Sequence, residues 1–200
     1  MERGDRSRET LFRGAAELFA ANGYHGTGIA DLERATGLSR GSIYHHVKGK
    51  DDLLFGITTE YLRRLIESGN ELLAQALPAA ERLRLFSRRV LQEIVEHLPE
   101  MTVCFRDLHG VSEGRRGQVL DLHREYEQVW AQMLQRGVDD GTFAPSFSGH
   151  LAVKALLGLH HYTYIWVRPD GPMSPDEIAD VFTDLALNGI LPRAAPEGAG

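Results

Sequence analysis

The chain has 200 residues, enough for one large domain or for a small domain joined to a larger one. Its net charge of −6 is uneven: residues 1–50 hold 8 Lys and Arg against 6 Asp and Glu, whereas residues 51–200 hold 14 against 22. A polycationic DNA-compaction protein is therefore excluded, and any affinity for phosphate must come from a local face of the first fifty residues.

The single cysteine, Cys104, excludes an internal disulfide and favours a reducing compartment. We see neither a signal-peptide pattern nor an apolar run long enough to cross a bilayer. We therefore expect a soluble, cytoplasmic protein.

The chain opens with a polar segment, residues 1–7, which we interpret as a mobile arm that either contacts DNA or is simply solvated. A first helix is predicted from Ser7 to Ala21, because apolar residues recur there at helical spacing. Its apolar face cannot stay uncovered, so it must support the helices that follow.

Two short helices joined by a tight turn are predicted next. The first covers Ile29 to Thr36, with Thr27 as its N-cap and Gly37 as the left-handed residue that ends it. Ser39 caps the second, which continues to about His45. Two helices around a glycine-containing turn are typical of the helix-turn-helix, whose second helix enters the DNA major groove.

The predicted DNA contacts lie around this second helix. Arg40 can bind guanine O6 and N7, and Gly41 allows close approach of the backbone. The full predicted set is Thr27, Arg40, Gly41, Ser42, Tyr44, His45, Lys48 and Lys50. The alternative is that Tyr44 packs on the first helix and that the two histidines are ordinary surface residues.

A long helix is predicted from Lys50 to about Ala76, as a mechanical connector, and an amphipathic helix between Pro78 and Pro99. A short irregular apolar segment then ends at Gly110, and Gly114 to Gly117 is a second weak point. Another long helix leads to Asp139-Asp140-Gly141.

The stretch His150 to Val167 is apolar on nearly all faces, so its own core or a partner subunit must cover it. Ser174 to Glu177 forms a capping box that starts the last helix, which Gly189 ends. No strand-like alternation occurs, so the predicted fold is all-α. We predict a DNA-binding domain over residues 1–50, a ligand-binding and dimerisation domain over 51–192 and a disordered tail over 193–200.

The segments T-G-I-A-D-L, A-T-G-L-S-R-G-S-I-Y-H-H-V and K-G-K-D-D-L resemble the N-terminal domain of the TetR family of bacterial transcriptional regulators, from roughly Glu9 to Leu54. The resemblance implies phosphate contacts at Thr27, Tyr44, His45 and Lys50. It also implies that the two C-terminal helices of each subunit pair as a four-helix bundle.

A dimer is expected on independent grounds, because one helix-turn-helix contacts too few base pairs for adequate specificity. The last two helices carry more apolar surface than a small domain needs, and Gly158 would allow close approach of a partner helix. Packing within the monomer is the alternative explanation for this apolar surface.

The middle helices are predicted to enclose an effector. The candidate ligand-binding residues are Met101, Phe105, Arg106, Tyr126, Trp130, Met133, His160, Tyr164 and Trp166. An ordinary core is the alternative for such an aromatic and methionine-rich set.

Three further features (Arg106 to His109, Phe143 after Gly141, and Trp166 to Pro172) resemble a subgroup of actinobacterial repressors of lipid, fatty-acid and steroid catabolism. The resemblance implies an acyl-CoA effector. Cations suited to its phosphates are Arg106, Arg115, Arg116, Arg124 and Arg168.

We therefore predict a ligand-responsive regulator, interpreted as a repressor released from a palindromic operator, with no cofactor and no enzymatic activity. A regulator of drug or efflux genes is one alternative. A thiol enzyme using Cys104 with His97 or His109 is another, but Cys104 lies in an apolar run. Metal binding at His45-His46 or His160-His161 is disfavoured because adjacent helical side chains diverge.

Overall fold

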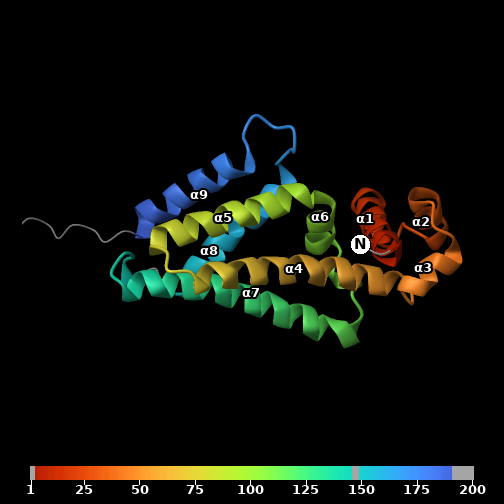
Figure 1. The fold of residues 1–200 in the computed structure, drawn as a ribbon, viewed down its shortest axis with the longest axis horizontal. Coiled ribbons are helices and arrows are strands. Elements are labelled where there is room, and N and C mark those ends of the chain that lie inside the picture. Colours follow the sequence, from red (N-terminus) through yellow and green to blue (C-terminus); the bar gives the residue numbers. More distant parts are fainter. Residues whose placement is uncertain (1–2, 146–148, 191–200) are drawn as a thin grey trace, which may run out of the picture. The chain divides into compact units, whose positions relative to one another are not determined.

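The computed structural model describes residues 3–145 and 149–190, and it confirms the all-α prediction (Figure 1). Within these ranges the structure holds nine α-helices, short 3₁₀ segments and no strand. Their bounds are α1 Arg3–Asn22, α2 Ile29–Thr36, α3 Arg40–His46, α4 Lys50–Ala74, α5 Ala79–Glu96, α6 Leu98–Arg106, η1 Leu108–Gly110, α7 Glu113–Asp139, α8 His150–His161, η3 Tyr162–Ile165 and α9 Pro175–Ile190. None of the described helices combines the length and apolar composition needed to cross a bilayer.

The helices form two compact units. The first unit combines residues up to 64 with residues 97–124, and the second combines residues 65–96 with residues from 125 onward. Helices α4 and α7 each begin in the first unit and continue along the chain into the second. The domain boundary near residue 50 stays a prediction.

The predicted support of the helix-turn-helix by α1 is present in the first unit. Leu11, Ala15 and Phe19 of α1 are fully buried, as are Leu32 of α2 and Ile43 of α3. Helix α6 packs on α1 within the same unit. There the Arg106 guanidinium donates to the Ala20 carbonyl at 2.9 Å and to the Phe19 carbonyl, so it ties α6 to the last turn of α1, where carbonyls have few partners within the helix.

A second tie in this unit joins the start of α7 to the first turn of α4. The Ser112 amide and hydroxyl donate to the Asp51 carboxylate at 3.0 and 3.1 Å. Arg115 forms ion pairs with Asp51 at 3.2 Å and with Asp52. The carboxylates that open α4 are therefore held by a segment sixty residues later in the chain.

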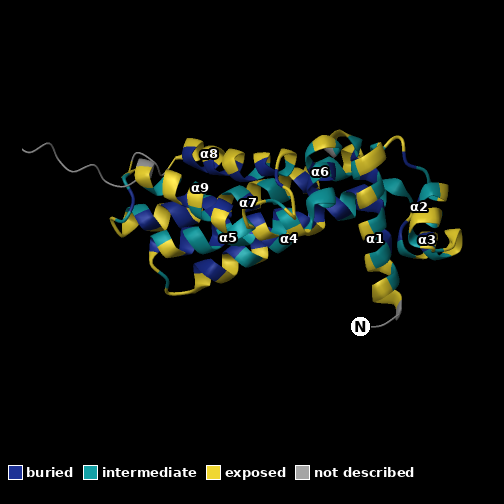
Figure 2. Cartoon of the chain, turned by 90° about the horizontal axis from the view of Figure 1, so that it is seen from above, coloured by how far each residue is buried: buried dark blue, intermediate teal, exposed yellow. Residues whose placement is uncertain are grey.

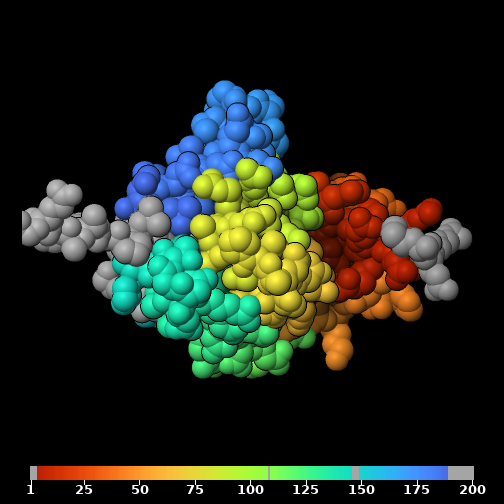
Figure 3. All heavy atoms as spheres, turned by 60° about the vertical axis from the view of Figure 1, so that its left-hand side comes forward, coloured from red at the N-terminus to blue at the C-terminus, as the bar shows by residue number. Residues whose placement is uncertain are grey.

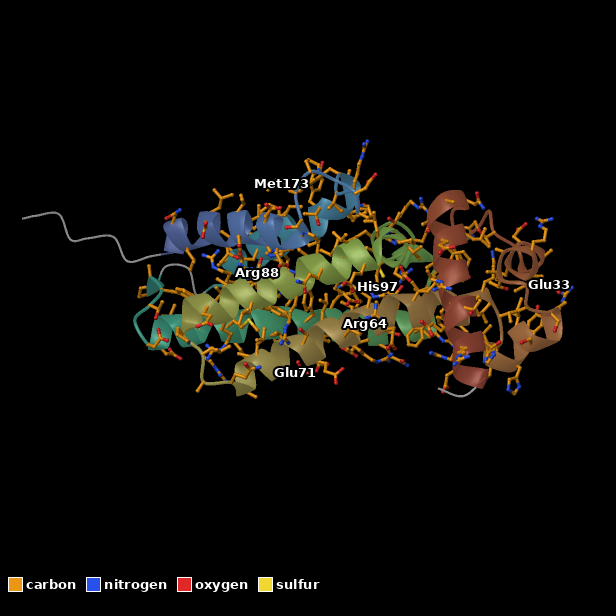
Figure 4. All side chains as sticks on the ribbon, turned by 45° about the horizontal axis from the view of Figure 1, so that its top comes forward. Glu33, Arg64, Glu71, Arg88, His97 and Met173 are labelled. Atoms are coloured by element: carbon orange, nitrogen blue, oxygen red, sulfur yellow. The ribbon has the colours of Figure 1, made fainter. Side chains whose placement is uncertain are left out.

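In the second unit, α5 and α9 lie side by side (Figure 1). Arg88, labelled in Figure 4, extends from α5 and forms an ion pair with Asp180 of α9 at 2.7 Å. Arg84 pairs with Asp180 and Asp184 at 3.3 and 2.6 Å. The segment before α9 and α9 itself lie on the surface of this unit in Figure 3.

Several sequence-based expectations about helix ends need correction. Helix α1 begins at Arg3, so most of the predicted arm is helical. Gly28, not Thr27, is the N-cap of α2: the Thr27 hydroxyl donates to the Leu18 and Gly23 carbonyls, and the Asp31 carboxylate accepts from the Gly28 amide at 2.7 Å.

The prediction of an irregular segment near Met101 is wrong as well. This segment is the regular helix α6, in which Pro99 occupies the first turn, where a missing N–H costs little. Gly114 and Gly117 lie inside the first turns of α7 rather than in a break. The predicted tail, residues 193–200, lies outside the described residues.

The stretch from His150 divides into α8 and the 3₁₀ segment η3, and it is not covered on all faces by this chain. Leu151 is 82 % exposed and Tyr162 is 63 % exposed, and Figure 2 shows exposed residues along α8. The capping box before α9 is confirmed, because the Glu177 amide donates to the Ser174 hydroxyl and the Ser174 amide donates to the Glu177 carboxylate.

Candidate DNA-binding and effector sites

The turn between α2 and α3 has the geometry that the sequence predicts. Gly37 adopts a left-handed conformation, with φ 69°, and its amide donates to the Glu33 carbonyl at 3.0 Å. Ser39 then caps α3, because its hydroxyl oxygen accepts from the Ser42 amide at 3.2 Å. Buried Leu32 and Ile43 fix the two helices against the rest of the unit.

This arrangement leaves one side of α3 in solvent. Arg40, Gly41, Tyr44 and His45 are exposed, and Ser42 is half-buried. The Arg40 guanidinium lies 5.8 Å from the centre of the Tyr44 ring, so the two side chains share one surface. Tyr44 is 44 % exposed, so part of its ring is accessible to solvent beside Arg40.

The other three predicted DNA-contact residues, Thr27, Lys48 and Lys50, lie outside α3. Lys48 is exposed, and its amide donates to the Asp52 carboxylate. The Lys50 ammonium donates to the Tyr24 and Thr27 carbonyls at 2.9 and 2.6 Å and lies over the Tyr24 ring. Thr27 is buried, so its hydroxyl is not available at the surface. Lys50 thus ties α4 to the loop that leads into α2.

Tyr24, Ser112 and Arg115 hold this region in shape, although the sequence did not point to Tyr24 or Ser112 and suggested another role for Arg115. Tyr24 lies under Lys50, and Ser112 and Arg115 hold the Asp51 and Asp52 carboxylates. In the sequence, only the Asp51-Asp52 pair could have pointed to these contacts. Two carboxylates in the first turn of a helix are, however, already explained by the positive end of the helix dipole. Their distant partners carry no periodic signature.

The nine predicted ligand-binding residues belong to different units. Met101, Phe105 and Arg106 lie in the first unit, where Met101 is fully buried and Arg106 is occupied by the α1 carbonyls. The other six lie in the second unit. Of those six, Tyr126, Trp130, Met133 and His160 are buried, Tyr164 is half-buried and Trp166 is 48 % exposed.

The buried residues of the second unit form an aromatic cluster. Trp130 lies 4.7 Å from Phe86 and 5.0 Å from His160, centre to centre, and His161 stacks on Tyr126 at 5.7 Å. His160 uses both ring nitrogens: Nδ1 donates to the Leu156 carbonyl, and Nε2 lies 2.7 Å from the Ser87 hydroxyl. Burial lowers the pKa of His160 to about 4, so this ring is neutral at pH 7.

The thiol-enzyme alternative finds no support in the geometry. Cys104 is buried, and burial raises the pKa of its thiol to about 12, so the nucleophilic thiolate does not form near neutral pH. Across the described residues, no three His, Cys, Asp or Glu side chains come together in a way that could hold a metal ion.

The fold and the exposed second helix define a helix-turn-helix DNA-binding protein. Comparison with known proteins then gives the family. Residues 11–57 match the family described as bacterial regulatory proteins, tetR family, and residues 76–190 match the tetracyclin repressor-like C-terminal domain. The chain belongs to the TetR family and is a ligand-responsive, DNA-binding transcriptional regulator.

Similar proteins extend over nearly the whole chain. The HTH-type transcriptional repressor KstR2 of Mycolicibacterium smegmatis is 27 % identical over 92 % of this chain and 90 % of its own. The structure of PfmR from Thermus thermophilus has a TM-score of 0.83 and 32 % identity, and covers 89 % of this chain and 97 % of its own. AibR in complex with isovaleryl coenzyme A and operator DNA shares the fold, with a TM-score of 0.77 and 21 % identity over 90 % of this chain and 97 % of its own.

Proposed function

We propose that the protein is a homodimeric repressor that binds a palindromic operator through α3 and leaves it when an effector binds in the C-terminal helices. The observation that carries this proposal is the solvent-facing surface of α3, with Arg40, Tyr44 and His45 next to Lys48. We place its action in the cytoplasm, where a bacterial operator lies.

On this proposal, Arg40 reads a base edge and its neighbours position the helix on the phosphates. Tyr44, His45, Lys48 and the Ser42 hydroxyl donate to phosphate oxygens, while Gly41 allows the backbone to come close. The Lys50 ammonium has three donors and uses two on carbonyls, so one remains for a phosphate. Thr27 would contribute through its amide, since its hydroxyl is engaged.

Two substitutions separate base reading from phosphate contact. Tyr44→Ala should weaken binding to all duplexes by a similar factor. Arg40→Ala should reduce the free energy of binding to the operator by about 1–3 kcal/mol and relax the base preference at particular operator positions. Fluorescence anisotropy on operator and scrambled duplexes at two salt concentrations measures both effects. Equal losses on both duplexes for Arg40→Ala would contradict a base-reading role.

The apolar surface of α8 and α9 supports the homodimer. Its exposed members include Leu151, Leu159 and Tyr162 on α8 and η3, and Val181 and Leu185 on α9. A Cβ added at Gly158 would meet nothing within 4 Å, which leaves room for a partner helix at that point. Pairing of these helices between subunits as a four-helix bundle would cover this surface.

For the effector we propose an acyl-CoA or another lipophilic molecule. The support comes from relatives: one similar structure is described as a ketosteroid transcriptional regulator, and AibR was solved with isovaleryl coenzyme A. Arg106 and Arg115 already hold partners in the first unit, and Arg124 forms an ion pair with Asp121, so the exposed Arg168 is the better candidate for a contact with the phosphates of coenzyme A.

Native mass spectrometry with a panel of acyl-CoAs, together with an operator-shift assay, tests this choice. A mass increase with one acyl-CoA and release of the operator at the same concentration would support it. Operator binding that no acyl-CoA disturbs, but that drug-like lipophiles relieve, would favour the alternative of a drug or efflux regulator. No turnover of any acyl-CoA is expected.

A further inference from the structure

Two hydrogen-bond donors one turn apart on α7 are buried without a partner. The Tyr126 hydroxyl and the Trp130 indole N–H are both on side chains with no exposed surface. Among the described residues, neither polar atom has a hydrogen-bond partner outside this pair. Buried polar groups are nearly always paired, and leaving one unpaired is costly, so two on one helical face point to a missing partner.

The chemistry of these groups defines what that partner must be. An indole N–H can only donate, and burial raises the pKa of Tyr126, with a smaller opposing effect from the Trp130 indole, so the phenol keeps its proton. An indole N–H shared with the phenol oxygen would still leave the phenol proton without an acceptor. The missing partner is therefore a hydrogen-bond acceptor.

The surroundings favour a neutral acceptor attached to an apolar body. The rings around the two donors are Phe86, His160 and His161, and His160 carries no charge at pH 7. A buried carboxylate would need a cation beside it, whereas a carbonyl oxygen needs only the two donors. Since both donors are fully covered, an acceptor can reach them only if the surrounding side chains of α5, α7 and α8 separate.

We propose that the effector presents a neutral carbonyl oxygen to the Tyr126 hydroxyl and the Trp130 indole N–H, with its apolar part among the aromatic side chains of the second unit. This inference rests on the proposed function, because it assumes that an effector binds in these helices. The effector stabilises the opened arrangement by supplying the acceptor that the closed one lacks. Replacing the carbonyl with a methylene group therefore reduces the affinity.

The test uses two matched probe pairs that differ only in the carbonyl. S-decanoyl-N-acetylcysteamine carries a thioester, and S-decyl-N-acetylcysteamine is its thioether; 2-undecanone and undecane form the second pair. In titrations of the full-length dimer, at least one carbonyl probe should bind about tenfold more tightly than its partner. Binding of neither carbonyl probe, or equal binding within both pairs, would overturn the proposal.

Variants locate the effect on the two donors. Tyr126→Phe should lower the affinity for the preferred carbonyl probe about tenfold and leave the affinity for the matched probe without the carbonyl unchanged. Trp130→Phe should also reduce the difference in affinity between the two probes. Met173→Leu, at a 44 % exposed methionine of the same unit, should change neither affinity. Tyr126→Phe should also leave the melting temperature of the free protein unchanged or raise it, since it removes an unpaired hydroxyl.

A fall in that melting temperature would show that a buried water or a side chain already satisfies the hydroxyl, and would count against the proposal. Operator-binding assays distinguish failure of the carbonyl contact from failure of the proposed function. If the operator is bound and released by lipophilic compounds without any preference for a carbonyl, only this inference fails. If no duplex is preferred at all, the proposed function fails first.

Discussion

At the scale of single residues, His160 shows how the second unit compensates a buried titratable group with hydrogen bonds. Its two ring nitrogens connect α8 to the Leu156 carbonyl and to Ser87 of α5, and the Ser87 hydroxyl also lies 3.2 Å from the Ala179 carbonyl of α9. Three helices therefore meet at one neutral imidazole. Protonation would place a charge there and leave Nε2 without its acceptor role.

The stability of the fold should consequently fall in mild acid. Burial holds the folded-state pKa of His160 at about 4, below its ordinary value of 6.5, so the unfolded state takes up the proton first. Neutral His160 therefore contributes to the free energy of unfolding in full above pH 6.5. This contribution falls progressively as the pH is lowered to 4, by about 3 kcal/mol in all. Urea unfolding at several pH values should show this loss in the native protein.

His160→Gln is the matched comparison. It should be less stable at pH 7 but should have a shallower pH dependence between pH 6.5 and 4, because acidic groups contribute equally to both proteins. Parallel curves for the two proteins over this range would contradict the assignment of the pH effect to His160.

The same scale shows which contacts could be predicted. Gly37 and Ser39 act on backbone groups within four residues, so the local sequence was sufficient for both. Thr27 was assigned wrongly as a cap because its hydroxyl donates instead to the Gly23 and Leu18 carbonyls, four and nine residues earlier. The Arg106 contacts with α1 join residues 86 and 87 positions apart, which no pattern in a single sequence reveals.

At the scale of helices, the end of α4 depends on a side chain from the next helix. Arg82 of α5 is buried and donates to the Leu72, Gln75 and Leu77 carbonyls at 3.2, 3.2 and 2.7 Å. The Gln75 and Leu77 carbonyls lie just beyond the last residue of α4, and the Leu72 carbonyl, in its last turn, also accepts from the Gln75 amide at 3.3 Å. The guanidinium thus fixes both the end of α4 and the connection to α5.

Arg82→Met should therefore destabilise the protein by about 1–3 kcal/mol, since it keeps much of the apolar contact but removes the hydrogen bonds to three carbonyls around the end of α4. Arg84→Met is the control on the same helix: Arg84 pairs with carboxylates at the surface, and such pairs contribute about 0–1 kcal/mol. Chemical denaturation of both variants measures the difference. Equal losses would mean that the carbonyl contacts of Arg82 have no special role.

Helix positions were largely predictable from apolar spacing, whereas their interruptions were not. Pro99 and the glycines at 114 and 117 suggested breaks, but α6 begins with the proline and α7 continues through the glycines. The Ser112 and Arg115 contacts with Asp51 and Asp52 hold the start of α7 in place. Tertiary contacts of this kind outweigh the low helix propensity of glycine.

At the scale of the whole molecule, the exposed apolar residues of α8 and α9 predict how subunits associate. Leu185→Glu should convert the proposed dimer to a monomer of 22.3 kDa at micromolar concentration, because it places a charge in the subunit interface. Leu120→Glu, at a 47 % exposed leucine of α7, should remain dimeric. Analytical ultracentrifugation distinguishes the two masses, and a dimeric Leu185→Glu protein would place the interface elsewhere.

The path of the backbone through the two compact units has an evolutionary consequence. The chain passes from one unit to the other near residues 64, 96 and 124, twice within a helix. A single recombination point between the two segments of the first unit would therefore split it. Arg106 and Arg115 would then come from one parent protein and their hydrogen-bond acceptors from the other. We therefore expect operator preference to change during evolution through point substitutions on the exposed side of α3. Exchange of the whole first unit between relatives should be rare.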